Sequence, residues 1–469
     1  MQYSVVNYRT VKENFDFRID AEYFDPKYLQ LDQILNKKGA IELCKISLKI
    51  SDGTHFTPNY TNEGIPFLSA INIKENYFDI GVNYEFISKE EHKKLTKRCK
   101  PSKGDVLLRK VGVGPRWACV IPDNTFEFSI FVSVAQIKPK SIHSEYISTF
   151  INSKYGQEQL LRFNKGISQP DLHLEDIRRL KIPIIDKRII EITTNLYKKS
   201  FKFIEKSKSL YSQAEQLLLS ELGLLDWKPK HTLSFVKNFS NTKEADRFDA
   251  EYFQPKYEEI VDAVKKYKSG FDALGNLVKI KDKNFTTKDN EQYKYIELAN
   301  ISSNGEINGY TENFGNELPS RARRKVQKGD LIVSTIEGSL ESIALITEDW
   351  KNALCSTGFF AVNSDKINSE TLLVLLKTKV GQLQLKKGCK GTILTAIGKD
   401  ELSKIVLPKI DSKKQEEIKK RITEMYETKK LSKSLLEIAK RGVEIAIEKD
   451  EQGAEKWING EAGKLGIKT

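Results

Sequence analysis

Apolar residues recur every seven positions in a long stretch in the middle of the chain. Small side chains, among them Ser200, Ser207 and Ala214, stand four positions after the large ones, which are Leu196, Phe203, Leu210 and Leu217. Heptads that alternate large and small residues are typical of a helix that packs closely along a second helix. The pattern predicts a helix over residues 188–222, ending at Gly223 with Pro229 beyond it.

A second stretch near the end of the chain shows the same spacing. Leu431, Ile438 and Ile445 are seven positions apart, and residues 413–448 are otherwise rich in Lys and Glu, as the exposed face of a helix should be. A helix of about 34 residues is roughly 50 Å long. We interpret the two as an antiparallel coiled-coil pair. The alternative is that each is an ordinary amphipathic helix of its own core.

The remaining parts of the chain favour strands and turns. Short apolar or β-branched runs bounded by Gly, Pro and Asp occur at residues 64–68, 105–108 and 330–333. Turn signals occur at residues 51–54 and 303–305. These features predict α+β domains, each with a curved or partly barrelled sheet.

The chain is also duplicated. Arg-Ile-Asp-Ala-Glu-Tyr-Phe at residues 18–24 returns, with Phe for Ile, at residues 247–253, and Lys-Gly-Asp at 103–105 returns at 328–330. These separations far exceed the roughly 20–50 residues of solenoid repeats, so a whole domain is repeated. We expect two pseudo-symmetric globular domains separated by the helix pair. The predicted boundaries are 1–187 and 227–410 for the domains, 188–226 and 411–449 for the helices, and 450–469 for a glycine-rich, loosely attached tail.

Composition narrows the class of partner. Lys and Arg number 77 against 64 Asp and Glu, a net charge of +13, which favours a polyanion such as nucleic acid, although many soluble proteins are simply rich in lysine. No apolar run is long enough to span a bilayer, and the first residues do not resemble a signal peptide. Five scattered cysteines and five dispersed histidines argue against disulfides and against a metal site. We expect a cytoplasmic protein with no metal site.

Sequence motifs for catalysis are weak. Asp-Pro-Lys-Tyr at residues 25–28 differs from the Asn-Pro-Pro-Tyr loop of amino-methyltransferases, and no glycine-rich turn follows a strand to hold S-adenosylmethionine. Gly112 and Gly114 are followed by Pro115, where a phosphate-binding helix should begin. The sequence therefore favours a chain that binds and positions, with any reaction carried out by a partner.

Basic residues precede the Lys-Gly-Asp element in both halves. Lys93, Lys97 and Arg98 lie upstream of the first copy, and Arg321, Arg323 and Arg324 upstream of the second. A single cluster of this kind is usually a solvated loop, but its recurrence at equivalent places favours contact with DNA phosphates.

In these motifs the chain resembles the specificity subunit of type I restriction-modification systems. The resemblance covers roughly residues 15–448. It is carried by the repeated 18–24 motif, by Ser-Asp-Gly-Thr-His-Phe-Thr-Pro at 51–58 leading to 64–68, and by Lys-Gly-Ile-Ser-Gln-Pro-Asp-Leu at 165–172 leading to 180–183. The second half departs from it, because the Asp-Gly-Thr-His-Phe turn and the Gln-Pro-x-Leu segment are missing there.

The resemblance implies a non-catalytic subunit that reads a bipartite, asymmetric duplex site with two recognition domains. Two methyltransferase subunits, and restriction–translocase subunits besides, would be its partners, and these would hold S-adenosylmethionine, ATP and Mg²⁺ for adenine N6 methylation or cleavage. On this basis we predict phosphate contacts at Lys93, Lys97, Arg98, Lys165, Arg321, Arg323, Arg324 and Lys390. Predicted base contacts are His55, Lys110 and Arg116 in the first half and Thr335 and Glu337 in the second.

Three alternatives remain open from sequence. The chain could be a self-contained DNA methyltransferase or nuclease, the specificity subunit of a related type II system, or a scaffold whose helices assemble other proteins. The target bases, the gap between half-sites and solubility without partners are not encoded in any recognisable motif.

Overall fold

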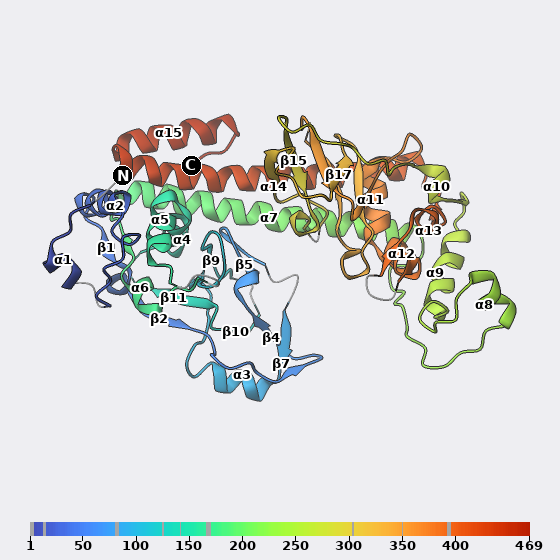
Figure 1. Ribbon diagram of the computed structural model, residues 1–469, viewed down its shortest axis with the longest axis horizontal. Coiled ribbons are helices and arrows are strands. Elements are labelled where there is room, and N and C mark those ends of the chain that lie inside the picture. The colour runs from blue at the N-terminus through green and yellow to red at the C-terminus, as the bar shows by residue number, and fades with distance from the viewer. Residues whose placement is uncertain are drawn as a thin grey trace. The chain divides into compact units, whose positions relative to one another are not determined.

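A computed structural model describes residues 4–12, 16–79, 84–123, 126–140, 142–165, 170–302, 304–348, 350–391 and 395–469. The chain divides into two compact units. Unit 1 comprises Met1–Ile204 and Lys429–Thr469, and unit 2 comprises Glu205–Thr428. The predicted long helices are confirmed as α7 (Lys187–Glu221) and α14 (Ser412–Glu448), and each contributes residues to both units (Figure 1).

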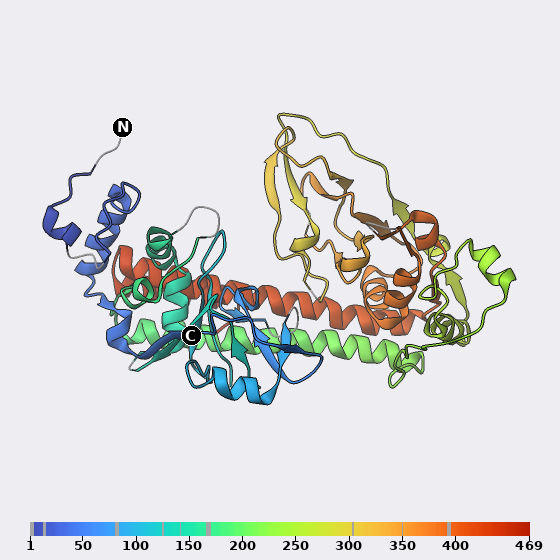
Figure 2. The same ribbon diagram turned by 60° about the horizontal axis from the view of Figure 1, so that its bottom comes forward.

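The two long helices pack against each other in antiparallel directions. In unit 1 the buried hydroxyls of Ser200 and Ser432 are 3.1 Å apart, and in unit 2 Lys206 Nζ lies 2.7 Å from Glu424 Oε1. Residue numbers therefore rise along α7 as they fall along α14, and both views show the helices side by side (Figure 2). Small residues at the seam allow the close approach that the heptads predicted. In unit 2 the seam joins the core through Leu210, Ala214, Leu218, Ile418, Ile422 and Met425.

Each unit contains a four-stranded antiparallel sheet of the same topology. The order is β2-β11-β8-β9 in unit 1 and β14-β21-β18-β19 in unit 2. The predicted strands after the two Lys-Gly-Asp elements are confirmed as β8 and β18, near the middle of these sheets. The bounds are β2 (Ser47–Asp52), β8 (Val106–Arg109), β9 (Ala118–Val120), β11 (Val134–Pro139), β14 (Lys279–Lys281), β18 (Leu331–Ser334), β19 (Ile343–Leu345) and β21 (Phe359–Asn363).

Each unit also contains a second four-stranded sheet. Three strands of this sheet are equivalent in the two units, and the fourth differs. In unit 1, β4 lies between β7 and the parallel strand β10, and in unit 2, β15 lies between β16 and the parallel strand β20. Unit 1 adds β3 beyond β7, whereas unit 2 adds β17 beyond β20. Each half thus has two four-stranded sheets where we predicted one curved or partly barrelled sheet. The bounds are β3 (Tyr60–Thr61), β4 (Ile65–Leu68), β7 (Glu85–Ile87), β10 (Ser129–Ile130), β15 (Gln292–Ile296), β16 (Thr311–Phe314), β17 (Ala322–Lys325) and β20 (Ala353–Ser356).

Short strand pairs and helices complete the frame in the same order in both units. The strand that begins each globular part pairs with the strand that ends it: β1 (Ile41–Glu42) with β12 (Lys181–Ile182), and β13 (Phe271–Ala273) with β24 (Val406–Pro408). Two consecutive helices pack on each core: α4 (Ser144–Asn152) and α5 (Lys154–Phe163), and α11 (Ser369–Lys377) and α12 (Lys379–Lys387). No helix within the described ranges is long and apolar enough to cross a bilayer.

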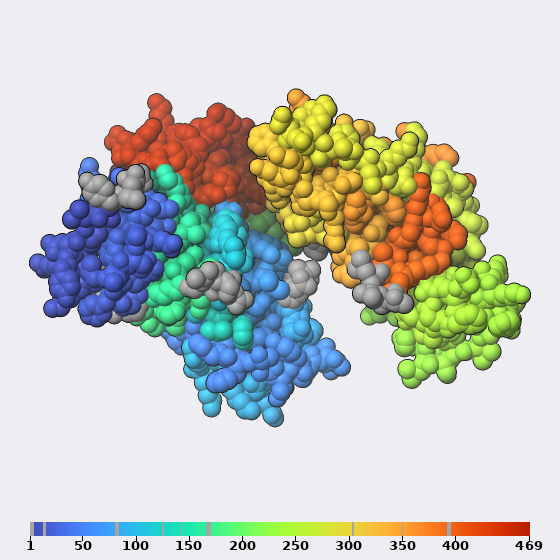
Figure 3. All heavy atoms as spheres, viewed as in Figure 1, coloured from blue at the N-terminus to red at the C-terminus, as the bar shows by residue number. Residues whose placement is uncertain are grey.

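The C-terminal residues form an ordered helix, α15 (Glu451–Lys464), at the surface of unit 1 (Figures 1 and 3). Asp450 caps the start of this helix, because its side chain accepts a hydrogen bond from Gly453 N at 2.7 Å. Ala454, Ile458 and Ala462, four positions apart, are fully buried. The predicted loose attachment of this tail is therefore wrong, because this apolar stripe outweighs the helix-weakening glycines.

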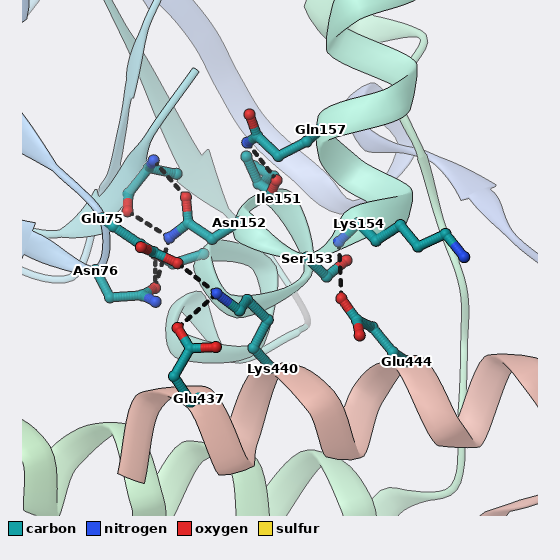
Figure 4. Close-up of polar contacts among 12 residues, drawn as sticks. Glu75, Asn76, Ile151, Asn152, Ser153, Lys154, Gln157, Glu437, Lys440 and Glu444 are labelled. Atoms are coloured by element: carbon teal, nitrogen blue, oxygen red, sulfur yellow. Dashed lines mark hydrogen bonds and ion pairs between the residues drawn. The ribbon is translucent and has the colours of Figure 1, made fainter. Parts of the chain in front are cut away.

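In unit 1 the helix α14 is fastened to the globular part by polar contacts (Figure 4). Lys440 Nζ bridges Glu75 Oε1 at 2.7 Å and Glu437 Oε1 at 2.6 Å. One turn further, Glu444 accepts a hydrogen bond of 2.8 Å from Lys154 N, at the start of α5. A carboxylate at a helix N-terminus meets amides that have no partner inside the helix, so this contact fixes α5 on α14.

Candidate nucleic-acid interface

The predicted turn after β2 is held rigidly against β10. Thr54 N donates to Ile130 O at 3.1 Å, and Val132 N donates to Thr54 O at 2.9 Å. Between them, Gly53 lies so close to the Ile130 carbonyl that a Cβ atom would stand 1.9 Å from its oxygen. Only glycine fits there, which explains the Asp-Gly-Thr sequence of the turn.

Asp52 brings three of the predicted DNA-contacting residues together. Its carboxylate, 3% exposed, lies 2.8 Å from Lys110 Nζ, 2.5 Å from Arg98 Nη2 and 3.5 Å from His55 Nε2. Arg98 Nη2 is also 2.9 Å from His55 Nε2. Burial raises the pKa of Asp52, but Lys110 and Arg98 lower it more, so its pKa lies below the usual value. We name Asp52, His55, Arg98 and Lys110 the Asp52 cluster.

Members of the Asp52 cluster differ in their access to solvent. The Lys110 side chain is 4% exposed, so its charge neutralises Asp52 inside the protein. Arg98 and His55 are 55% and 51% exposed and can reach a ligand from the surface. Lys93, on α3 (Lys89–Leu95), and Lys97 are exposed as well. Because its amine is buried, Lys110 would influence a base only indirectly in this arrangement. The predicted contact between Lys110 and DNA stays a prediction.

Arg116 is fully buried. Its guanidinium donates to the carbonyl oxygens of Gly112, Gly114 (3.2 Å) and Pro170 (3.0 Å), and to Asn164 Oδ1 at 3.0 Å. Burial lowers the pKa of this guanidinium. These bonds tie the loop after β8 to the segment around Pro170, so the predicted base contact of Arg116 would require the loop to open.

Lys165 and Lys390, which lie at corresponding places in the two halves and each precede a glycine, are paired with carboxylates. Lys165 Nζ lies 2.9 Å from Asp16 Oδ2 and 3.2 Å from Asp176 Oδ2, and Lys390 Nζ lies 3.3 Å from Glu401 Oε1. A phosphate would have to compete with these partners. Residues 166–169, within the motif at 165–172, and residues 392–394 of the second half lie outside the described residues.

In unit 2 the predicted arginines lie on or beside β17, at the edge of the second sheet. Arg321 and Arg323 are exposed, whereas Arg324 is half-buried. Within the described part of the chain, Nε and Nη1 of Arg324 are buried and have no hydrogen-bond partner. In unit 2 the basic residues therefore lie on or beside the edge strand β17. In unit 1 the corresponding basic residues lie on α3 and on the residues after it.

Thr335 and Glu337 follow β18 at the place where Lys110 follows β8. Thr335 is 8% exposed and donates to Gly358 O through both N (2.9 Å) and Oγ1 (3.1 Å). Glu337 is half-buried, and its N donates to Thr395 O at 3.0 Å. Thr335 is thus part of the framework, and Glu337 is the more accessible of the two predicted base contacts.

The same junction of two loops recurs in both units. After β8, Val111 forms an isolated antiparallel β-bridge with Asp171. After β18, Ile336 forms the same kind of bridge with Ala396, at corresponding positions of the repeat. The shared backbone carries different side chains, because Lys110 is charged and paired with Asp52 where Thr335 is uncharged. This combination of a constant frame and variable side chains suits two readers of different sequences.

Sequence reasoning missed two features of unit 1. One is the role of Asp52, read only as a turn residue, because its partners are 46 and 58 positions away. The other is an open hollow of about 570 Å³ beside the Asp52 turn, lined by Tyr60, Phe67, Ser69, Ile71, Tyr84, Glu85 and Phe131. These residues come from β3, β4, β7, β10 and their flanks, and no local sequence pattern joins them.

Neither a protein-family model nor a curated protein matches this sequence. Among solved structures, the type I restriction-modification S subunit from M. genitalium aligns at 14% identity over 89% of this chain and 95% of its own, with a TM-score of 0.40. The chain is similar to type I S subunits. A structure from work on assembly and conformational transition of a type I system aligns at 13% identity over 90% and 97% of the two chains. The HsdS subunit from Thermoanaerobacter tengcongensis aligns at 11% over 88% and 96%. Both have a TM-score of 0.25, and none of these likenesses assigns a role to a residue of this chain.

Proposed function

We propose that this chain is the DNA-recognition subunit of a type I restriction-modification system, with one half of a bipartite duplex site bound by each unit. The repeated loop junction after β8 and β18 carries the proposal. At this junction, equivalent backbone positions lie at the end of the equivalent sheet in each unit, and they carry different side chains. The motifs at residues 18–24, 51–58 and 165–172 support the same family.

Electrostatics supports duplex DNA as the ligand. The chain carries 77 Lys and Arg against 64 Asp and Glu. In unit 1 Arg98 contacts the Asp52 turn and the exposed cations Lys93 and Lys97 precede Arg98 in sequence, and in unit 2 Arg323 lies on the edge strand β17 with Arg321 just before it. Lysine and arginine at the rim of a recognition surface neutralise phosphates and release counterions, which supplies much of the affinity for DNA.

The proposed partners are two methyltransferase subunits, joined by restriction–translocase subunits in the complete complex. The chain itself would be non-catalytic, and S-adenosylmethionine, ATP and Mg²⁺ would be bound by those partners, which would methylate adenine at N6 or cleave DNA. The complex would act in the cytoplasm. In this proposal the paired helices α7 and α14 set the gap between the two half-sites.

Sequencing of methylated bases in the host, with and without this gene, tests the proposal. We expect an asymmetric motif of two half-sites, methylated at adenine N6, that disappears when the gene is deleted and returns with a plasmid copy. A motif that persists without the gene would contradict the proposal. Methyl transfer by the purified chain alone would favour a self-contained methyltransferase. Copurification with a single bifunctional methyltransferase–nuclease would favour a related type II system.

A further inference from the structure

Phe56 is an exposed aromatic residue on a turn that is fixed in place. Its side chain is 82% exposed. The Thr54 hydroxyl accepts a hydrogen bond from Phe56 N and donates one to Phe56 O, both at 3.1 Å. The base of the turn is fixed by Gly53 against Ile130. The ring is therefore presented to solvent at a defined position, which reduces the entropy lost when a ligand meets it.

The surroundings of Phe56 are basic. In the Asp52 cluster, Lys110 and Arg98 face the single carboxylate of Asp52, so two positive charges meet one negative charge. Arg98 extends to the surface beside His55, the residue that precedes Phe56. The Arg98 main-chain oxygen also accepts a hydrogen bond of 2.5 Å from Lys49 Nζ, which adds a further cation nearby.

An exposed ring among cations fits nucleic acid better than an apolar protein surface. The neighbours His55, Thr57 and Asn59 are polar and exposed, so Phe56 is flanked by polar side chains on the turn. Docking surfaces for proteins bury an apolar centre inside a polar rim. DNA presents phosphates that attract the cations and stacked bases that accept an aromatic ring.

We propose that Phe56 acts as a wedge that inserts at a base step of the duplex bound by unit 1 and kinks it. This inference rests on the proposed function. It makes Phe56 a residue that selects the binding position of unit 1 by the deformability of the DNA sequence. Proteins that insert Phe or Leu between base steps partly unstack them and bend the duplex. Flexible pyrimidine–purine steps cost least to unstack, so we expect one at the position of Phe56.

The test uses the complex isolated from the host through a tag on this chain. A duplex of about 40 base pairs, longer than two half-sites and their gap, is first selected by the wild-type complex from a pool with a randomised centre. We expect Phe56→Ala to weaken binding of that duplex by about 10- to 100-fold, because an aromatic stacking contact is lost. The slope of log affinity against log salt should not change, since no phosphate contact is removed. Energy transfer between dyes at the duplex ends should report a smaller bend.

Two variants serve as controls. Phe56→Leu keeps an apolar wedge and should retain the bend, with affinity within about threefold of wild type. Phe239→Ala removes an exposed ring, 72% exposed, on α8 (Phe239–Ala245) of unit 2, and should change neither affinity nor bend. An unchanged melting temperature shows that each variant folds.

The outcomes separate failure of the wedge from failure of the proposed function. Equal affinity and equal bend for wild type and Phe56→Ala would overturn the wedge. Loss of a copurifying protein with DNA binding intact would overturn it too, and would assign the ring to a protein contact. If the wild-type complex selects no sequence and binds duplex without salt dependence, the proposed function itself fails.

Discussion

The hydroxyl of Tyr426, on α14, donates a hydrogen bond of 2.8 Å to the main-chain oxygen of Gly305. The same contact occurs in the other unit, where Tyr197, on α7, donates to Asn76 O at 3.1 Å. The tyrosines are 229 positions apart, as are the two acceptors, and both acceptors have positive φ, 79° and 53°. The repeat therefore extends into the long helices. Each globular part is fastened to the long helix that follows it in sequence.

Removal of either tyrosine hydroxyl should destabilise its unit. Tyr426→Phe should lower the free energy of unfolding by about 1–2 kcal/mol, because a buried carbonyl loses its donor. Tyr197→Phe should cost more, about 2–3 kcal/mol, since the Tyr197 hydroxyl also accepts from Val120 N at 3.0 Å. Urea unfolding measures both changes. Tyr8→Phe, at a residue 76% exposed, is the control and should have no effect.

Gly53 should tolerate no side chain. In Gly53→Ala the new Cβ would collide with the Ile130 carbonyl, and we expect a loss of roughly 3 kcal/mol in unfolding free energy together with displacement of the Asp52 turn. Gly104→Ala is the matched comparison. Gly104 has φ of 79° but no atom within 4 Å of its Cβ position, so only backbone strain of about 1–2 kcal/mol is expected. Similar losses at both positions would contradict the steric explanation.

Local patterns predicted the long helices and the strands beside Lys-Gly-Asp, because their signals lie within a few turns or a few residues. They could not predict the pairing of Asp52 with Lys110, which depends on the order of strands β2, β11 and β8. A base contact was predicted for Arg116, since nothing in the sequence around it shows that carbonyl oxygens enclose its guanidinium. The helix α15 is not evident in the sequence, because its glycines disfavour a helix and only three positions form its buried stripe.

Substitution of Asp52 should show how much the buried ion pair of Asp52 and Lys110 contributes to the free energy of unfolding. Asp52→Asn leaves Lys110 buried without a counter-charge, and we expect a loss of about 3–5 kcal/mol at neutral pH. Adding Lys110→Met should restore most of the stability, because no unpaired charge then remains. Urea unfolding of the single and double variants measures the coupling. Equal stability of the two variants would mean that Lys110 finds another partner.

The same pair should make unit 1 sensitive to acid. The pKa of Asp52 is lowered in the folded protein, so its contribution is complete above the unfolded-state pKa of about 4 and is lost as pH falls through the folded-state pKa. We expect wild-type stability to fall more steeply below about pH 4 than that of Asp52→Asn with Lys110→Met. Unfolding curves between about pH 3 and pH 7 at fixed ionic strength would show the difference. Parallel pH profiles would contradict it.

Charge reversal on β17 should weaken DNA binding through phosphates alone. Arg323→Glu removes an exposed cation whose Nε donates to Ser320 O, so the fold should survive. We expect the slope of log affinity against log salt to fall by about 1, with uniform weakening across DNA sequences. Lys268→Glu makes the same change of charge at a residue 70% exposed and should leave the slope unchanged. Equal slopes for wild type and Arg323→Glu would remove Arg323 from the interface.

Longer helices should widen the gap between recognised half-sites. Seven residues inserted after Ser207 in α7 and seven after Thr423 in α14 would preserve the heptad spacing, and Lys206 would still face Glu424, because both lie on the same side of the insertions. Each insertion adds about 10 Å of helix, or roughly three base pairs of duplex. We expect the methylated motif in the host to keep both half-sites and gain about three base pairs between them. Insertion in α7 alone should abolish methylation, since it lengthens one helix against an unchanged partner and displaces contacts such as Ser200–Ser432 by one heptad. A doubly extended chain that methylates the original motif would show that the helices do not set the gap.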